Sequence, residues 1–317
     1  MNPNRCRGLI VAPRTSTMPQ LSVRQTVILA AGFGSRLSAT RGDLPKPLVR
    51  VAGKTLLDHA LGQAAAAGCD EAIVVTGNAA EMIRDHLASV RTALPVKLVH
   101  NERYQEPNGV SLMTAEPLID GPFFLQMADH LFAEPVLPIL ADRLSAPAGY
   151  QRLLVDFKPV GIDEDDATKV KVQHGRITAI GKDVWEYDAV DTGYFLLDPR
   201  VFGALKEVAQ AEPPSVTLGM RKLIAADQLA AVSLTGVRWT DVDTPEDYSK
   251  AEVLLASAGR RQKIAASLRT GDGRRKTEDG REGNTKDCHS ERSEESQCRS
   301  IDEMSASGFL GRFAPSE

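Results

Sequence analysis

Two glycines and two basic side chains lie close together after a short apolar segment of the sequence. Gly32 and Gly34 follow the apolar residues 26–30, and Arg36 and Lys46 come shortly afterwards. Glycine lets a backbone come close to an anion and present its N–H groups to it, and arginine and lysine add positive charge. This combination predicts a binding site for a nucleoside triphosphate.

The spacing around these glycines does not fit two common phosphate-binding loops. A dinucleotide-binding fingerprint needs glycine where this chain has Leu37, and a P-loop needs Gly-Lys-Ser/Thr, which does not follow either glycine. An ordinary glycine turn between a strand and a helix is the alternative interpretation. Pro45 and Pro47 argue against it, because they stiffen the backbone on both sides of Lys46.

Carboxylates suited to a metal ion occur at two distant places. Asp129 lies just beyond the end of the predicted strand 123–127, where it could hold Mg²⁺ against phosphates, although capping of a following helix is an alternative role. Asp241 and Asp243 alternate on a predicted strand face. The helix start at Thr244 does not account for either of them.

Composition places the chain among ordinary globular proteins. It has 317 residues, of which 42% are hydrophobic and 25% charged, and a formal net charge of −4. This charge indicates neither a nucleic acid nor an anionic membrane as partner, and no apolar stretch is long enough to predict membrane insertion. The cysteines show no metal-binding spacing, which favours a reducing, cytoplasmic location; they are Cys6, Cys69, Cys288 and Cys298.

Alternating strand and helix patterns predict an α/β fold. Strands are expected at 26–30, 72–76, 96–99 and 123–127, and helices from Thr55 to Gly68 and over 79–87. Such alternation predicts a single Rossmann-like domain, with a mostly parallel central sheet and helices on both faces.

The second half of the domain predicts a small antiparallel β excursion and further helices. Its expected strands are 153–157, 169–172, 176–180 and 194–197, with a hairpin turn at His174-Gly175. The expected elements that follow are helices 200–208 and 216–226, strand 230–234 and a last helix 245–256.

Both ends of the chain differ from this domain in composition. Residues 1–20 are expected to be a dispensable leader, disordered in large part, with Met18 as an alternative start. Residues 21–260 are the expected domain. Residues 261–317 form a polar tail that carries too little apolar surface to fold and is expected to be disordered.

The segment 29–37, with Pro45-Lys46-Pro47-Leu48 and 51–54, resembles the signature of nucleotidyltransferases that couple an NTP to a sugar phosphate or polyol phosphate, the superfamily of MobA-like NTP transferases. The resemblance implies that the loop wraps the triphosphate and that Arg36 and Lys46 contact its phosphates. It also implies that Asp129 and Asp243 bind Mg²⁺, with Asp241 the less favoured ligand. Lys46, Arg36 and Asp129 are the expected catalytic residues.

The resemblance also implies a nucleotide side and an acceptor side of the site. The expected nucleotide-binding residues are Leu29, Ala30, Ala31, Gly32, Gly34, Ser35, Arg36, Lys46, Thr76, Asn108, Gly109 and Ser111. The expected acceptor-binding residues are His130, Lys182, Thr192 and Gly193. Three of these have structural alternatives, because Asn108 could cap a helix, Lys182 could be a surface lysine and His130 could orient its loop.

Five further sequence segments resemble the inositol-1-phosphate cytidylyltransferase domain, which makes CDP-inositol from CTP and inositol 1-phosphate. They are residues 97–104, 108–112, 129–132, 165–170 and 187–193. In many relatives this domain is fused to a membrane-embedded alcohol phosphotransferase. The short polar C-terminal segment instead predicts a separate membrane partner if the pathway is the same.

Other functions stay open from the sequence. Phosphocholine is a rival acceptor, since Trp185, Tyr187 and Tyr194 could form an aromatic cage for its cation. Hexose 1-phosphate with UTP or dTTP is another. A catalytically silent nucleotide-binding regulator is a candidate of a different class, although the joint presence of Arg36, Lys46 and the carboxylates argues against it.

Overall fold

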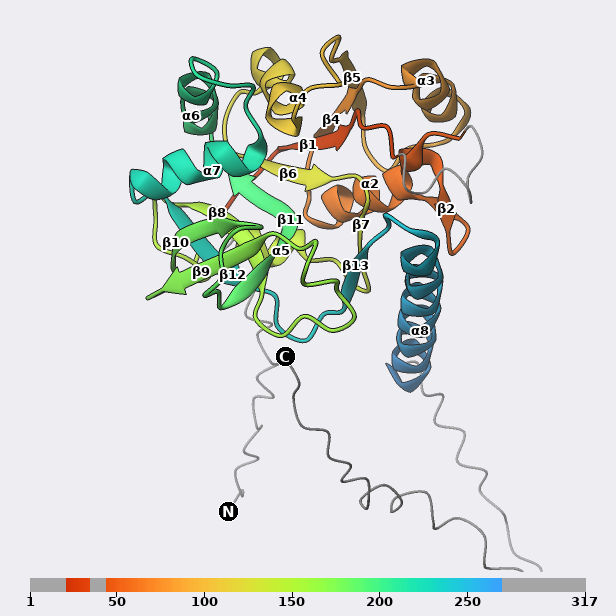
Figure 1. The fold of residues 1–317 in the computed structure, drawn as a ribbon. Coiled ribbons are helices and arrows are strands. Elements are labelled where there is room, and N and C mark those ends of the chain that lie inside the picture. The colour runs from red at the N-terminus through yellow and green to blue at the C-terminus, as the bar shows by residue number, and fades with distance from the viewer. Residues whose placement is uncertain (1–20, 35–43, 270–317) are drawn as a thin grey trace, which may run out of the picture. The chain divides into compact units, whose positions relative to one another are not determined.

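The computed structural model describes residues 21–34 and 44–269, with the side chains of 260–269 left aside (Figure 1). Its strands are β1 Gln25–Ala30, β2 Arg50–Val51, β3 Lys54–Thr55, β4 Glu71–Thr76, β5 Val96–His100, β6 Phe123–Met127, β7 His130–Phe132, β8 Gln151–Asp156, β9 Lys169–Gln173, β10 Arg176–Gly181, β11 Ala189–Leu197, β12 Leu229–Ser233 and β13 Trp239–Asp241. Its helices are η2 Lys46–Leu48, α2 Leu56–Ala66, α3 Ala80–Ser89, α4 Asn108–Thr114, η3 Glu116–Leu118, α5 Leu137–Ala141, α6 Arg200–Val208, α7 Val216–Ala225 and α8 Pro245–Arg269.

A nine-stranded sheet in the order β5-β4-β1-β6-β11-β8-β12-β10-β9 forms the centre of the molecule. The first four strands of this order are parallel, as expected from the alternation of strands and helices. The carboxyl ends of β1 and β6 therefore lie at the same edge, which is where ligands bind in open α/β sheets.

The antiparallel strands belong to this same sheet. β11 pairs antiparallel with both β6 and β8, and β9 and β10 form the predicted hairpin. His174 and Gly175 both have positive φ at its turn, 51° and 77°, which suits a tight hairpin. The sheet is consequently mixed, with its parallel half on one side of β11.

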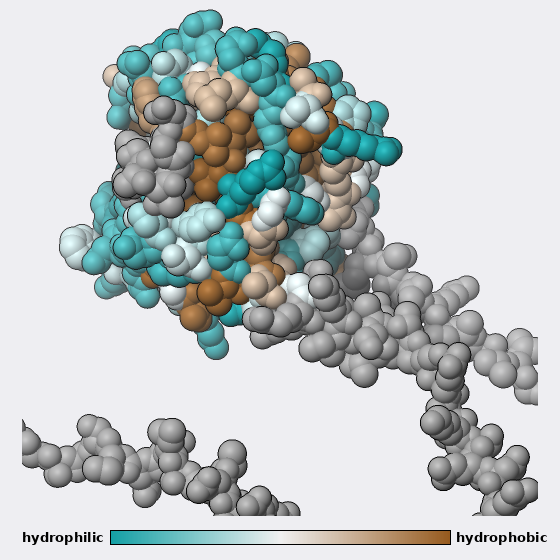
Figure 2. Space-filling model, turned by 90° about the vertical axis from the view of Figure 1, so that its right-hand side faces the viewer, coloured by the Kyte–Doolittle hydropathy of each residue, from teal (hydrophilic) through white to brown (hydrophobic). Residues whose placement is uncertain are grey.

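Helices cover both faces of the sheet, as predicted. Val27 and Ile28 are neighbours on β1, yet each is 0% exposed and each packs in a different apolar cluster. One cluster includes residues of α2 and α5, and the other residues of α4, α6 and α7 (Figure 1). On the side of the molecule that carries α8, hydrophilic residues cover most of the surface, with apolar residues gathered near the middle (Figure 2).

The local signals for α2 are confirmed in detail. The Thr55 side chain accepts a hydrogen bond from Asp58 N, and the Asp58 side chain accepts one from Thr55 N, which is a complete capping box. Gly68, with φ +79°, follows the helix and ends it. These short-range hydrogen bonds explain why the boundaries of α2 could be predicted closely.

Several elements differ from expectation, and three of these differences matter most. β11 begins at Ala189 rather than 194, because pairing with β9 extends it. Asp129 is followed by strand β7 and not by a helix, which excludes helix capping as its role. α8 continues to Arg269, beyond both the expected helix end at 256 and the expected domain end at 260.

Parts of the sequence predictions lie outside the described residues. These are the leader 1–20, Ser35 and Arg36, and the tail from 270 onward. None of the helices in the described part of the chain is both long and apolar enough to span a membrane.

Candidate active site

Lys46 lies between the two predicted metal-binding carboxylates. Its Nζ is 2.6 Å from Asp129 Oδ2 and also forms a direct ion pair with Asp243 Oδ1. The Lys46 side chain is only 9% exposed, and those of Asp129 and Asp243 are 31% and 20% exposed. Three residues far apart in the sequence therefore converge on one partly buried point.

Local backbone structure places each of these groups. Pro45 and Pro47 flank Lys46, which begins the short helix η2, and Val49 N donates back to Lys46 O at 3.0 Å. Asp129 follows β6 at the edge where β1 also ends. The backbone N–H of Val242, the residue before Asp243, donates to Asp129 O at 3.0 Å and links the two carboxylate segments.

The charges of this cluster stabilise one another. Burial by itself would lower the pKa of the Lys46 ammonium, but Asp129 and Asp243 outweigh burial and raise that pKa above its ordinary value. Burial likewise opposes ionisation of Asp129, while the charge of Lys46 and the hydrogen bond from His130 hold its pKa well below the usual range. Lys46 and Asp129 are thus both charged near neutral pH.

His130 connects this cluster to its surroundings. Its Nδ1 is 2.8 Å from Asp129 Oδ1, and its ring stacks on Trp239 with centroids 5.7 Å apart and planes 10° apart. Burial would lower the pKa of the imidazole, but Asp129, together with Asp241 and Asp191, raises it. His130 therefore both orients Asp129 and faces the cavity beside it.

Two cavities meet at Asp243. The loop cavity, of 370 Å³, is lined by Leu29, Ala30, Gly32, Phe33, Gly34, Lys46, Pro47, Ala128, Asp129 and Asp243. The histidine cavity, of 430 Å³, lies on the other side, and its lining includes Asn108, His130, Asp166, Lys182, Asp191, Gly193, Trp239, Asp241 and Asp243. Two reacting molecules held in these cavities would meet at the lysine and the carboxylates.

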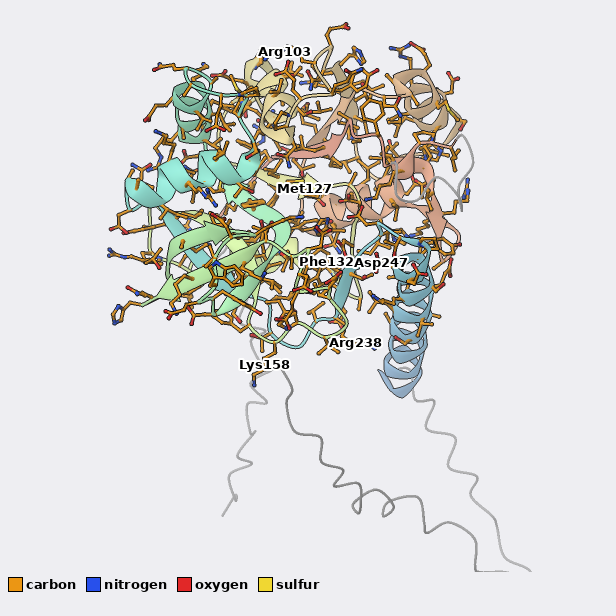
Figure 3. All side chains as sticks on the ribbon, in the orientation of Figure 1. Arg103, Met127, Phe132, Lys158, Arg238 and Asp247 are labelled. Carbon is orange, nitrogen blue, oxygen red and sulfur yellow. The ribbon has the colours of Figure 1, made fainter. Side chains whose placement is uncertain are left out.

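A larger cavity of 520 Å³ lies apart from these carboxylates. Its lining comes from Arg103, from α4 and from residues 209–214. In Figure 3, Arg103 lies well away from Met127, at the end of β6, and from Asp247, near the start of α8. The convergence of charged groups therefore identifies the site better than cavity size does.

The structure brings together part of the predicted nucleotide side. Leu29, Ala30, Gly32, Gly34 and Lys46 all line the loop cavity. Ala31 adjoins them, and its carbonyl accepts a hydrogen bond from Asn78 N. Ser35 and Arg36 belong to the same loop but lie outside the described residues.

Four other residues predicted on the nucleotide side are engaged elsewhere. The Thr76 hydroxyl donates to Val99 O, and the buried Ser111 hydroxyl accepts from Asn101 Nδ2. A Cβ at Gly109 would lie 2.5 Å from Pro214 O, so this glycine serves close packing. Asn108 lines the histidine cavity, and its Oδ1 accepts from Val216 N instead of capping its own helix.

The acceptor-side prediction needs one correction. The Thr192 side chain is 0% exposed, and its hydroxyl donates to Leu154 O inside the sheet. The neighbouring Asp191 and Gly193 line the histidine cavity instead. Lys182 lies at the same cavity in an ion pair with Asp166.

The sequence analysis did not predict Asp191 as a site residue, although it directly precedes the predicted residues Thr192 and Gly193. The alternation of a regular strand could have suggested that Asp191 and Gly193 share one side and Thr192 the other. Glycine is needed at position 193 because its φ is +71° and because a Cβ there would lie 2.9 Å from the His130 ring.

The donor set fits a single Mg²⁺ ion. Within the described residues, no group of three or more His, Cys, Asp or Glu side chains is arranged to hold a metal. Mg²⁺ commonly binds one or two carboxylates and completes its shell with phosphate oxygens and water, which two aspartates satisfy. Asp129 and Asp243 converge as required, whereas Asp241 faces the histidine cavity, and burial and then Asp243 raise its pKa.

Gly34 provides a first test of this geometry. It has φ +58°, and a Cβ there would lie 2.6 Å from Lys46 Cβ. We expect Gly34→Ala to displace the lysine and to lower turnover roughly 10- to 100-fold, as misplacement of a catalytic group by about 1 Å does. The control is Gly121→Ala, whose added Cβ meets nothing within 4 Å; equal turnover in both variants would contradict the prediction.

The chain matches a known family model and several curated proteins. Residues 26–156 match the model of the MobA-like NTP transferase domain. A Rubrobacter xylanophilus protein named bifunctional IPC transferase and DIPP synthase is 35% identical over 230 residues, covering 72% of this chain and 51% of that protein. A protein of the same name from Aquifex aeolicus is 33% identical over 238 residues, 74% of this chain and 52% of that protein. The chain spans about half the length of the curated relatives it matches.

Solved structures show the same fold. The inositol-1-phosphate CTP transferase from T. maritima superposes with a TM-score of 0.68 at 26% identity, covering 75% of this chain and 97% of that one. A UDP-glucose pyrophosphorylase complexed with UDP-glucose superposes with a TM-score of 0.62 at 18% identity, which shows likeness of fold alone.

Proposed function

Because this chain belongs to the MobA-like NTP transferase family of nucleotidyltransferases, we propose that it transfers a cytidylyl group from CTP to inositol 1-phosphate, giving CDP-inositol and pyrophosphate. One observation carries this proposal, namely the convergence of Lys46, Asp129 and Asp243 where the two cavities meet. The relatives named for this chemistry supply the choice of nucleotide and acceptor.

The proposed reaction is a single displacement at phosphorus. An oxygen of the acceptor phosphate attacks the α-phosphorus of the nucleotide, the bond to the bridging oxygen breaks, and pyrophosphate leaves with that electron pair. A phosphate oxygen is already nucleophilic, so no side chain has to remove a proton. The barrier is lowered by positioning and by neutralisation of charge, and Lys46 and Arg36 supply positive charge to the phosphates.

We propose that Asp129 and Asp243 hold Mg²⁺. When bound, the ion supplies a Lewis acid for the phosphate oxygens. The Lys46 ammonium forms ion pairs with both of these carboxylates. Gly32 and Gly34 line the loop cavity, where their backbone N–H groups would bind the phosphates, and His130 holds Asp129 in place.

The histidine cavity favours a hydroxylated acceptor. Asp191 and Asp241 offer carboxylate oxygens, which accept hydrogen bonds from hydroxyl groups, and Lys182 offers a cation for a phosphate. In the described part of the chain, the aromatic side chains lining this cavity are Phe195 and Trp239, and Trp239 is stacked on His130. Trp185 is 94% exposed and Tyr194 fully buried, so the aromatic cage expected for phosphocholine is not assembled there.

Asp191 gives a prediction that couples function to stability. Burial raises its pKa to about 6, against the opposing hydrogen bond from Gly193 N and the charge of His130. The folded protein thus binds this proton more tightly than the unfolded chain does, so its stability falls as pH rises from 3.8 to about 6. Asparagine cannot ionise at this position. We therefore expect Asp191→Asn to abolish this pH dependence and to raise the free energy of unfolding near neutral pH by roughly 1–3 kcal/mol.

The same variant should bind the acceptor less well. An amide at this position offers one acceptor oxygen in place of two, so the KM for inositol 1-phosphate should rise while the KM for CTP stays constant. Urea unfolding across this pH range and steady-state kinetics measure the two effects. Asp165→Asn, at an exposed position, is the matched control; an unchanged acceptor KM in Asp191→Asn would remove Asp191 from the site.

Pyrophosphate release tests the proposed function directly. The full chain is assayed with Mg²⁺ and each of CTP, UTP, dTTP, ATP and GTP, against inositol 1-phosphate, phosphocholine and glucose 1-phosphate. Release with CTP and inositol 1-phosphate alone supports the proposal. Release with another pair keeps the chemistry and replaces the substrates, and silence from folded protein favours a nucleotide-binding regulator.

The product also implies a second reaction. A CDP-activated polyol is a substrate for a transferase that displaces CMP with an alcohol, and we propose that a membrane-embedded alcohol phosphotransferase carries out this step. The curated relatives carry the name of a second activity, DIPP synthase, in addition to IPC transferase. Cytoplasmic location is part of this proposal, and the free thiol of buried Cys69 is consistent with it.

A further inference from the structure

A small apolar cluster lies directly beneath the site, separate from the two clusters that cover the sheet. This support cluster consists of Val49, Val51, Leu56, Leu131, Val242 and Ala251. Each of these side chains is at most 5% exposed. We propose that the support cluster, closed from outside by helix α8, is the device that positions Lys46, Asp129 and Asp243 relative to one another.

Every charged group of the site is close in sequence to a member of this cluster. Val49 follows Lys46 within the same turn, Leu131 follows Asp129 on β7, and Val242 directly precedes Asp243. Pairing of β7 with β13 and the hydrogen bond from Val242 N to Asp129 O continue this connection along the backbone. A shift of Val49, Leu131 or Val242 is therefore passed to a charged group through very few rotatable bonds.

Helix α8 closes the cluster and begins at the site itself. The helix starts directly after Asp243, with a capping box in which Thr244 and Asp247 exchange hydrogen bonds. Tyr248, Ala251 and Leu255, at helical spacing, form the face that packs on the cluster. At the hairpin between β2 and β3, Ala52 N donates to Glu252 Oε1 at 3.0 Å, which fixes the helix to the segment that follows Lys46.

Val201 lies in a different setting. It belongs to α6 and to a cluster on one face of the nine-stranded sheet, it is 0% exposed, and it is distant in sequence from Lys46, Asp129 and Asp243. A valine-to-alanine substitution in the support cluster or in the sheet cluster should lower the stability of the protein by a similar amount, because the atoms removed and their burial are the same. Only the loss beneath the site should also separate the lysine from the carboxylates.

The test compares Val242→Ala with Val201→Ala in the full chain. Both valines are 0% exposed, so the pair is matched in change and burial. We expect Val242→Ala to lower kcat roughly 10- to 100-fold, as misplacement of reacting groups does, with Val201→Ala close to wild type. Mn²⁺ affinity, measured by electron paramagnetic resonance without acceptor, should weaken in Val242→Ala alone.

This inference rests on the proposed nucleotidyl transfer, and the metal titration separates the two. If the wild-type chain turns over none of the substrate pairs, the proposed function fails, while the Mn²⁺ comparison still tests the support cluster. Equal Mn²⁺ affinities in the two valine variants would overturn the inference. If Val242→Ala does not fold, Leu255→Ala on α8 replaces it, with the same weakening expected.

Discussion

Replacing Lys46 with methionine should lower turnover roughly 10²–10³-fold, the scale of losing one preorganised charged donor at a phosphoryl-transfer site. Methionine keeps much of the apolar stem that packs against Gly34 and removes only the charge. The Lys46 ammonium is the group that contacts both carboxylates, so nothing else among the described side chains of the cluster duplicates its position. Pyrophosphate release under saturating substrates measures the effect on kcat.

The same variant carries a second signature that activity alone does not show. Without Lys46, Asp129 and Asp243 face each other without the ammonium between them, so the free protein should lose roughly 1–3 kcal/mol of stability. A divalent cation can replace that charge. We therefore expect Mg²⁺ alone to raise the melting temperature of Lys46→Met more than that of wild type.

Lys54→Met is the matched control for this prediction. Lys54 lies in the β2–β3 hairpin, close in sequence, and is exposed. It should melt and turn over like wild type, with and without Mg²⁺. Wild-type turnover in Lys46→Met would show that the lysine has no part in the reaction, whatever its effect on stability.

Replacing either of the proposed metal-binding carboxylates should lower turnover about as much as replacing Lys46. We expect Asp129→Asn and Asp243→Asn each to lower kcat roughly 10²–10³-fold, because each removes a charged ligand and leaves Lys46 with a single carboxylate. Mn²⁺ affinity should fall in both variants. Asparagine preserves the shape of the side chain, so these losses report charge rather than packing.

Asp241→Asn distinguishes this arrangement from the alternative metal ligand. Asp241 is close to Asp243 in sequence but faces the histidine cavity, away from the contacts of Lys46. Its replacement should leave Mn²⁺ affinity unchanged and affect chiefly the KM for the acceptor. The reverse pattern, with weak metal binding in Asp241→Asn and normal binding in Asp243→Asn, would exchange their roles.

Short-range signals were sufficient for most of the fold. The capping box at Thr55, the turn at His174-Gly175 and the buried strand after Gln25 are set by residues adjacent in sequence, so they could be read directly. The extension of β11 and the strand after Asp129 could not, because each depends on pairing with a strand distant in sequence.

By itself, the sequence determined the residue types of the site and the backbone near them. Glycines at 32 and 34, the prolines around Lys46 and the aspartate after β6 predict a phosphate-binding loop and a metal-binding edge from local sequence alone. The family resemblance favoured Asp243 over Asp241, but only the tertiary structure decided that Asp243 meets Lys46, and that Asp191 faces the cavity while Thr192 is buried. The physical reason is that residue type and local conformation follow from neighbours in the chain, whereas side-chain direction depends on strand register and on packing between distant segments.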